Sequence, residues 1–567
     1  MPEQRRVRQL VNGQNRAEVT SRFTRPFRRF GAAAGKFPCS LLSRETYSKR
    51  ECGQGGYGEL AAKRGPSSHR RCPHNLIGYE QWPAIFQLSV RRLPSALVES
   101  NNETIWRSPD RVTLSAMVPL FTRLIPHCLI ASISVLLAAQ DAAPRATVLN
   151  HVAVIDMTGR AIQRDMAVLI RGDRIAAIER AAGFNVPGAR VIDLTGRFLI
   201  PGLVDMHNHL DTGASIPGSP IPGQGAAHDV RANLKELLGW GVTTVFSTSH
   251  ANVDLREFAE LRRAALADTA LPRYFGVGRA ISVAAGHASS PRFASYLPAA
   301  PDEARSNVRE MHAIGVDAIK LIYADQAHTG RPPVPMMQPE VMRAIIEEAH
   351  RLGLKAYVHA PGLRQAKEVL RAGGDGLVHS VTDAPVDDEF ITLMKKNNAT
   401  YTTTLSLYTA FSDVAAWMQR LAAMDTRGRV PKDVYARFQS AEGTKAYHAS
   451  AGTFPPENLR YAKANVRRAV DAGIPVLAGT DTGVPGVLLG ISSQMELVLL
   501  VDAGLTAAEA LASATINPAR ALGRHQEQGT IERGKLADLL VLDADPLADI
   551  RNINNIHLVI KGGIANN

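Results

Sequence analysis

Short apolar runs and amphipathic stretches alternate along the chain between about residues 203 and 523. Each apolar run is five to nine residues long, as expected for a buried strand, and each precedes a stretch with the apolar spacing of a helix. Eight such units predict an α/β fold of the (β/α)8 TIM-like barrel type, with a doubly wound open sheet as the rival. The predicted strands are 203–207, 242–248, 273–281, 317–323, 355–360, 376–380, 399–405 and 475–481.

Strand-like segments with turn signals flank this region on both sides. The first segment, 147–200, has hairpin turns at Gly172-Asp173 and Thr195-Gly196, and the second is 526–563. Each segment is too small to bury a core alone, so we expect the two to pair into a small β-sandwich domain beside a barrel domain at 201–525. An insertion at about 405–465 is expected to form helices over the barrel mouth and to shape the substrate pocket.

The N-terminal part of the chain has a different character. Residues 1–116 are rich in arginine and show no period of a helix or strand, whereas Met117 opens a short basic stretch followed by the apolar run 129–137 and several alanines. This is the layout of a signal peptide at 117–143, and the run is too short for a stable membrane anchor. If translation starts at Met117, the extension 1–116 is artefactual and the protein is periplasmic or secreted; otherwise the basic extension is genuine and the protein is cytoplasmic.

Charge and cysteine content narrow the possible functions. The formal net charge of the chain is +12, but residues 1–116 hold 20 basic and 9 acidic residues, so the remainder is close to neutral. This distribution argues against nucleic-acid binding by the folded part. All four cysteines lie before residue 129, which excludes a disulfide or thiolate metal site in the later chain.

Histidine, lysine and aspartate side chains occur on or at the ends of five of the predicted strands. In a barrel, the carboxyl ends of the strands converge on one active site. Imidazole and carboxylate groups are ligands for Zn²⁺ and similar ions, and a lysine within an apolar strand is costly to bury without a partner. A lone histidine would be read as an ordinary core or surface residue, but these six residues share one predicted place: His207, His209, Lys320, His359, His379 and Asp481.

The motifs around these residues resemble those of the amidohydrolase superfamily, specifically its imidazolonepropionase-like and Xaa-Pro dipeptidase-like branch. The resemblance covers roughly 147–563 and leaves out 1–116. The matching motifs are PGLVDMHNH (201–209), DAIKL (317–321), AYVHA (356–360), GLVHS (376–380), LAGTDTG (477–483), TINPARALG (515–523) and GTIERGKLADLLVLDADPL (529–547).

The resemblance implies a role for each metal-ligand candidate. His207 and His209 would bind one ion together with Asp481, and His359 and His379 would bind a second. Asp481 would also be the general base for a metal-bound water molecule, since a carboxylate beside a metal can accept the proton of that water.

The resemblance also implies that Lys320 is carboxylated by CO₂ and bridges two divalent ions, most simply two Zn²⁺, as a carbamate anion. Two further residues are weaker candidates. His287, in Ala-Gly-His at 285–287, resembles a substrate-loop motif of this branch. Tyr323 could polarise a substrate carbonyl through its hydroxyl, although loop packing is an alternative explanation for both.

The function that the resemblance implies is hydrolysis of a carbon–nitrogen bond by metal-bound hydroxide. The substrate would be a small molecule: an amide, an N-acyl amino acid, a dipeptide or a cyclic amide. Hydrolysis of a lactone or phosphotriester on the same centre is an alternative, and a non-catalytic scaffold with an amidohydrolase fold is another. A homo-oligomer is compatible with the sequence.

Overall fold

The computed structural model describes residues 146–211, 229–249, 254–290 and 293–566. The predicted extension at 1–116 and the signal-peptide candidate at 117–143 lie outside these residues. Within the described ranges, no helix is both long enough and apolar enough to cross a membrane.

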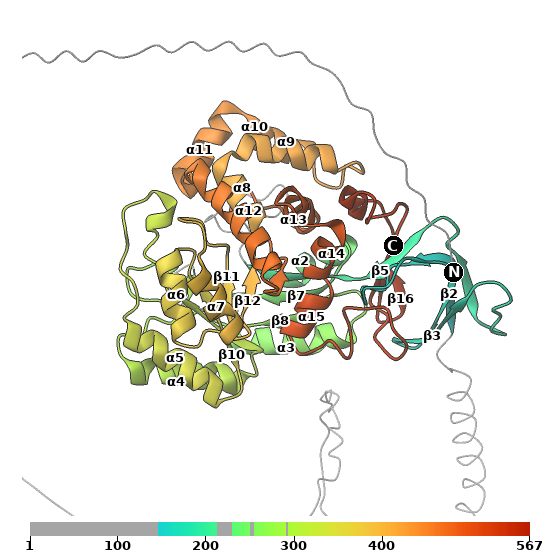
Figure 1. Cartoon of the computed structure of the whole chain (residues 1–567), viewed down its shortest axis with the longest axis horizontal. Coiled ribbons are helices and arrows are strands. Elements are labelled where there is room, and N and C mark those ends of the chain that lie inside the picture. The colour runs from blue at the N-terminus through green and yellow to red at the C-terminus, as the bar shows by residue number, and fades with distance from the viewer. Residues whose placement is uncertain (1–145, 212–228, 250–253, 291–292, 567) are drawn as a thin grey trace, which may run out of the picture. The chain divides into compact units, whose positions relative to one another are not determined.

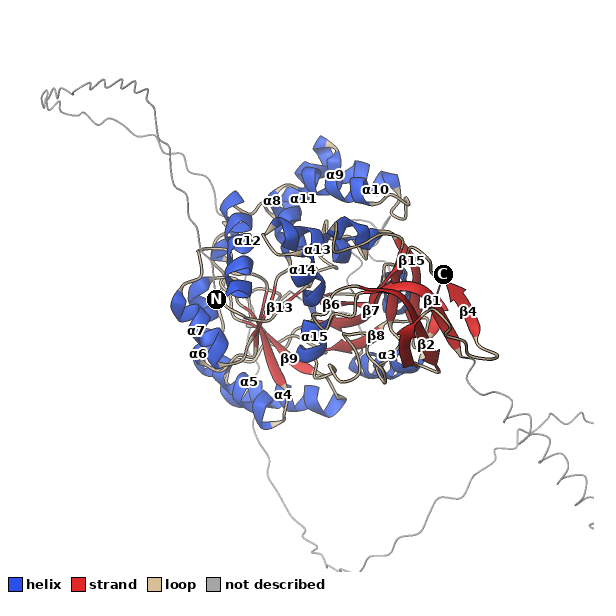
Figure 2. Ribbon diagram, turned by 45° about the vertical axis from the view of Figure 1, so that its right-hand side comes forward, coloured by secondary structure: helices blue, strands red, loops and turns tan. Residues whose placement is uncertain are grey.

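The small β domain draws strands from both ends of the described chain (Figures 1 and 2). β5 pairs antiparallel with β14, so the two segments extend one eight-stranded sheet, of order β16-β15-β14-β5-β1-β2-β3, with β4 beside β1. The predicted β-sandwich is therefore not confirmed, because the two segments share one hydrogen-bonded sheet. The strands are β1 Thr147–Val154, β2 Gln163–Arg171, β3 Arg174–Arg180, β4 Arg190–Asp193, β5 Phe198–Pro201, β14 Leu539–Leu542, β15 Ile556–Lys561 and β16 Ile564–Asn566.

All eight strands predicted for the central region are present. They form a three-stranded parallel sheet, β6-β7-β8, and a five-stranded parallel sheet, β13-β12-β11-β10-β9. Most residues of these strands are buried on both faces, as expected for parallel strands covered by helices, although β12 is Thr-Tyr-Thr rather than an apolar run. Their bounds are β6 Leu203–Asn208, β7 Val242–Ser247, β8 Arg273–Gly276, β9 Ala318–Ile322, β10 Lys355–His359, β11 Gly376–Val378, β12 Thr400–Thr402 and β13 Val476–Leu477.

Individual bridges connect the two parallel sheets at both junctions. Ile281, after β8, bridges to Leu321 of β9, and Asn208 of β6 bridges to Thr482, after β13. The eight strands thus follow the order of a TIM barrel, but the described strands form two sheets rather than one continuously paired barrel.

Helices cover the outer faces of these strands (Figure 2). Several begin with a side-chain cap, such as Asp229 before α2 and Asp387 before α7, and α4 ends at Gly315 in the left-handed conformation. The bounds are α2 Val230–Gly239, α3 Leu255–Ala267, α4 Pro301–Ile314, α5 Pro339–Arg351, α6 Leu363–Arg371, α7 Asp388–Lys396, α12 Pro456–Asp471, α13 Ile491–Asp502, α14 Ala507–Ser513 and α15 Ile516–Ala521.

The insertion is helical, as predicted. Between β12 and α12 it forms α8 Leu405–Ser412, α9 Val414–Met424, α10 Lys432–Gln439 and α11 Ala441–Ala451, drawn in orange in Figure 1. Trp417 of α9 is fully buried, and its Nε1 donates to Gly486 O at 2.8 Å. The insertion is therefore packed onto the segment that follows β13.

Candidate metal centre

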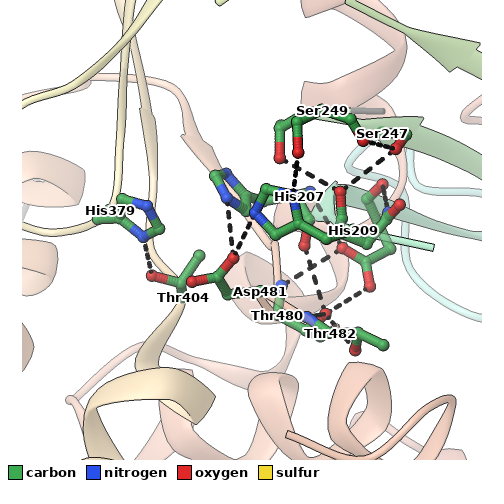
Figure 3. A network of polar contacts seen from close by, with 12 residues as sticks. His207, His209, Ser247, Ser249, His379, Thr404, Thr480, Asp481 and Thr482 are labelled. Carbon is green, nitrogen blue, oxygen red and sulfur yellow. Dashed lines mark hydrogen bonds and ion pairs between the residues drawn. The ribbon is translucent and has the colours of Figure 1, made fainter. Parts of the chain in front are cut away.

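His207 and His209 lie at the end of β6 and both reach the same carboxylate. His207 Nε2 is 3.1 Å and His209 Nε2 is 2.9 Å from Asp481 Oδ1, which comes from the segment after β13 (Figure 3). The two imidazole rings are 5.3 Å apart between centroids and nearly perpendicular, at 81°. The two-residue spacing thus brings both side chains to one point, as the sequence predicts.

Two further histidines join this cluster from β10 and β11. His379 directly follows β11, and its ring centroid lies 4.5 Å from that of His207. His359, the last residue of β10, lies 4.5 Å from His379 in the same measure. Potential ligand atoms of His207, His379 and Asp481 all lie within 4.8 Å of one another.

The backbone at this cluster is unusual for residues with side chains. His379 has φ 77° and Asp481 has φ 66°, both in the left-handed region, and Thr404, whose hydroxyl contacts His379, has φ 48°. Non-glycine residues adopt this conformation at a cost, and such strain concentrates at functional sites. The fold therefore fixes the direction of these side chains tightly.

Lys320 occupies the middle of β9 and is buried, with 3% of its surface exposed. It shares its face of the strand with Ala318, which packs inside the sheets, while Ile319 and Leu321 pack toward the helices. Burial lowers the pKa of Lys320 to about 7, even though Asp481 attracts its charged form. The lysine thus lies close enough to the cluster to interact electrostatically with Asp481.

Burial favours the neutral form of three histidines of the cluster, His207, His359 and His379. It lowers the pKa of His207 to about 3, with a further contribution from Lys320, and it lowers the pKa of His359 and His379 well below the ordinary value. Burial alone would raise the pKa of Asp481, but the neighbouring imidazoles, His207 first, hold it well below the usual value. Neutral imidazole and ionised carboxylate are the forms that bind metal ions.

Several buried polar atoms of the cluster make no hydrogen bond of good geometry among the described residues, although two of them, His207 Nε2 and Asp481 Oδ1, lie only 3.1 Å apart. They are both ring nitrogens of His207, Nε2 of His359 and Oδ1 of Asp481. Buried polar atoms are almost always satisfied, so this group requires an explanation. A divalent ion fits, because nitrogen and oxygen donors of this kind suit Zn²⁺ and related ions.

Hydroxyl groups orient two of the rings from behind. Ser249 Oγ lies 2.6 Å from Nδ1 of His209, and Thr404 Oγ1 lies 2.9 Å from Nδ1 of His379 (Figure 3). Contacts at one ring nitrogen set the tautomer and turn the other nitrogen toward a metal. For both residues, Nε2 is thus the nitrogen available to the centre.

Asp205 was not singled out from the sequence, although it lies two residues before His207. Its carboxylate is buried and accepts hydrogen bonds from the backbone N–H of His207, the hydroxyl of Thr480 and the hydroxyl of Ser493. Burial raises the pKa of Asp205 to about 6. This residue ties the end of β6 to the segment that carries Asp481.

The structure brings His287 to the edge of the cluster. Its ring stacks on that of His359, with centroids 4.5 Å apart and planes at 22°. Its Nδ1 contacts the side-chain amide of Gln326, and burial lowers its pKa to about 4. His287 is therefore placed beside a candidate ligand.

Tyr323 is not brought into the cluster. Its hydroxyl donates to Glu368 Oε2 of α6 at 2.7 Å, and its ring belongs to the core between β9 and the helices. Burial and the contact with Glu368 raise the pKa of this phenol. Because the hydroxyl points to Glu368 and away from the cluster, the structure does not favour the predicted contact of Tyr323 with a substrate carbonyl.

Aromatic side chains that the sequence did not single out lie next to two of the histidines. Tyr408 of α8 is 6.5 Å from His379, and His328 is 6.5 Å from His359, between ring centroids. Phe454 joins them, at 5.7 Å from Tyr408 and 6.1 Å from His328. The insertion thus contributes Tyr408 and Phe454 next to the candidate ligands. Nothing in the local sequence distinguishes these two residues from other aromatic residues of the insertion.

Comparison with known proteins places this geometry in a family. The family model described as "Amidohydrolase family" matches residues 198–565. An imidazolonepropionase of Streptomyces avermitilis is 27% identical over 431 residues, which cover 71% of this chain and 84% of that protein. An imidazolonepropionase of Geobacillus kaustophilus is 40% identical over 104 residues only, so the chain spans 24% of the length of that relative.

A solved structure supports the fold. The crystal structure of a Xaa-Pro dipeptidase with methionine bound in its active site matches with a TM-score of 0.57 and 24% identity, covering 74% of this chain and 99% of that chain. At this identity the likeness concerns the fold, which agrees with the order of the eight parallel strands.

Proposed function

Because the chain belongs to the amidohydrolase family and is a hydrolase acting on carbon–nitrogen bonds, we propose that it cleaves an amide-type bond of a small molecule with divalent ions held around Asp481. The observation that carries this proposal is the cluster of His207, His379 and Asp481. Three potential ligand atoms from three separate strand ends lie within 4.8 Å of one another, and two of these residues carry buried atoms that make no hydrogen bond of good geometry in the described structure.

The proposed centre would hold two Zn²⁺ ions. His207, His209 and Asp481 would hold the first, and His359 and His379 would hold the second. This division follows the family resemblance, and the contacts of Asp481 with the first two histidines support it.

In this proposal Lys320 would be carboxylated by CO₂ and, as a carbamate, would be a shared ligand of the two ions. Only a neutral amine reacts with CO₂, and burial lowers the pKa of Lys320 to about 7, so a substantial share of the amine is neutral near neutral pH. The carbamate is an anion, which also removes the cost of a buried cation beside four histidines.

Bound ions would polarise the scissile carbonyl and make a water molecule more acidic near neutral pH. The carboxylate of Asp481 accepts the proton of the attacking water, since its pKa is held low by the surrounding imidazoles and it stays ionised. His287, stacked on His359, lies at the edge of the centre, where it can donate a hydrogen bond to the substrate.

The rings of the insertion favour a substrate with an apolar group. Tyr408 and Phe454, both buried, lie beside His379 and His328, and Phe411 packs against Phe454 with ring centroids 4.7 Å apart. We therefore infer that the group next to the cleaved bond is aliphatic or aromatic, because aromatic side chains gain most by burying such groups.

A hydrolysis screen tests the proposal. The metal-loaded chain is offered N-acyl amino acids, dipeptides and cyclic amides with apolar or charged side groups, and lactones and phosphotriesters in parallel. The expected result is turnover of an amide with an apolar group, and a lower kcat/KM for charged analogues. Turnover confined to lactones or phosphotriesters would replace the proposed reaction with another one on the same centre.

We also propose that Met117 begins a signal peptide and that the mature protein is exported. Under this proposal the catalytic barrel is 201–525, and 147–200 and 526–563 form the second domain. Sequencing the N-terminus of the native protein tests this: a start after residue 137 is expected, and a start well before Met117 would contradict it.

A further inference from the structure

Glu496 is a fully buried carboxylate in the second turn of α13, outside the metal centre. Both of its oxygens accept hydrogen bonds from one short segment, 403–406. Oε1 accepts from Thr403 Oγ1 at 2.6 Å and Leu405 N at 2.8 Å, and Oε2 accepts from Ser406 N at 2.7 Å and Ser406 Oγ at 2.8 Å. All four donors are neutral, so they solvate the buried carboxylate in place of water.

This segment is the start of α8, which lacks the usual cap. Thr404 occupies the N-cap position with φ 48° and makes no side-chain hydrogen bond to the helix. The side chain of Glu496 instead accepts hydrogen bonds from the backbone N–H groups of Leu405 and Ser406, in the place of the missing cap. Thr404 is therefore free to turn its hydroxyl elsewhere.

The hydroxyl of Thr404 is turned to the metal centre. Its Oγ1 lies 2.9 Å from Nδ1 of His379 (Figure 3). A second connection fixes the distance between the two segments, because Ser380 donates to Thr403 O both from its backbone N, at 3.2 Å, and from its Oγ, at 2.9 Å. Glu496 thus holds the segment on which the orientation of the His379 ring depends.

We propose that Glu496 is a positioning residue for the metal centre: it holds Thr404 against Nδ1 of His379, and so fixes which nitrogen of His379 faces the ion and in which direction. The inference rests on the proposed function, since it assigns His379 as a metal ligand. Groups behind a metal ligand change metal affinity by about 10- to 100-fold when they are removed.

The chemistry of the four donors explains why a carboxylate is needed. Glutamine has one acceptor oxygen, and its NH₂ group would face one backbone N–H and one hydroxyl. The hydroxyl can turn to accept but the backbone N–H cannot, so Glu496→Gln disrupts at least one of the four contacts at nearly constant volume. Thr404→Val removes only the hydroxyl that contacts His379, whereas Thr404→Ser keeps it.

Asp425 offers a matched control. It is also a buried carboxylate that closes a turn of the insertion, accepting from Arg429 N and Val430 N at 2.9 Å each and from Tyr435 Oη at 3.1 Å. It contacts none of the candidate ligands through these bonds. Asp425→Asn therefore reports the stability cost of losing a buried carboxylate without a change at the centre.

The experiment measures the affinity of the full-length protein for Co²⁺ by competition with a chelator, the visible absorption bands of bound Co²⁺, and the midpoint of urea unfolding. Glu496→Gln and Thr404→Val are expected to weaken the binding of one ion by about 10- to 100-fold and to shift its absorption bands. Thr404→Ser is expected to restore both, and Asp425→Asn is expected to lower only the unfolding midpoint.

The contrary outcomes are distinct. If Glu496→Gln lowers the unfolding midpoint but leaves Co²⁺ affinity and absorption as in the wild type, Glu496 has a purely structural role. If Glu496→Gln does not fold, unchanged Co²⁺ binding by Thr404→Val overturns the inference by itself. A wild-type protein that binds no Co²⁺ would overturn the proposed function, and the role of Glu496 with it.

Discussion

His379 and Asp481 both have a left-handed backbone, with φ 77° and 66°, and their side chains meet in one cluster although they follow different strands. Two non-glycine residues in this conformation represent a cost of roughly 1–3 kcal/mol each, which the surrounding structure must offset. The backbone conformation therefore fixes the directions of the His379 and Asp481 side chains, and a metal centre requires ligands with fixed directions.

Asp481→Asn tests this carboxylate without disturbing the backbone, because asparagine tolerates the left-handed region. We expect kcat to fall by at least about 1,000-fold, since the variant loses both a ligand and the proton acceptor. Steady-state kinetics on any substrate found in the screen measures this. Asp388→Asn, which removes an exposed ion pair with Arg468, is the control and should keep wild-type rates.

Lys320→Ala tests the bridging carbamate. The variant is expected to bind one ion fewer per chain and to lose most of its activity, whereas Lys355→Ala should retain both. Lys355 begins β10 and donates from Nζ to Ala521 O at 2.7 Å, so it is a strand lysine at a distance from the ligands. Full metal content in Lys320→Ala would show that this lysine is not a bridge.

Tyr323→Phe tests whether the Tyr323 hydroxyl acts on the substrate, as the sequence suggested, or only stabilises the fold through its contact with Glu368. The hydroxyl donates to Glu368, so its removal should cost about 1 kcal/mol of unfolding free energy and change kcat by less than about 3-fold. Urea unfolding and steady-state kinetics give the two values. A fall in kcat of two orders of magnitude would restore Tyr323 to the catalytic machinery.

Glu348→Gln is expected to lower the free energy of unfolding in a pH-dependent way, through contacts that lie outside the metal centre. Glu348 of α5 pairs with Arg351 at 2.7 Å and with Arg309 of α4 at 3.1 Å, and these hydrogen bonds, that of Arg351 first, lower its pKa to about 2. A carboxyl with a depressed pKa stabilises the folded state above its ordinary pKa, and this stabilisation is lost as the pH falls toward 2.

Wild type and Glu348→Gln should therefore differ by about 1 kcal/mol at pH 7, allowing for the exposure of the arginines, and the difference should shrink steadily below about pH 4.5. Urea unfolding across this pH range measures it. The same difference at pH 7 and pH 3 would mean that charge does not account for the contact.

The strands and their polar ends could be predicted from the sequence because both follow from short-range patterns. An apolar run marks most of the buried strands, and a two-residue spacing places His207 beside His209 without any contact from distant parts of the chain. Tyr323 lies three positions after Lys320, directly past the end of β9, and an odd offset along an extended chain turns the two side chains to opposite sides.

The remaining features depend on contacts between distant parts of the chain. Glu496 lies 90 residues after Ser406 in sequence, and no local pattern marks a carboxylate that will cap another helix. The pairing of β5 with β14 joins segments separated by the whole barrel, so the sequence predicted two β segments but not that they share one sheet.

The metal content of the purified protein tests the central claim most directly. Elemental analysis of the wild type is expected to find close to two divalent ions per chain; removing them with a chelator should abolish hydrolysis, and adding Zn²⁺ should restore it. Hydrolysis that continues at the same rate in metal-free protein would contradict the account.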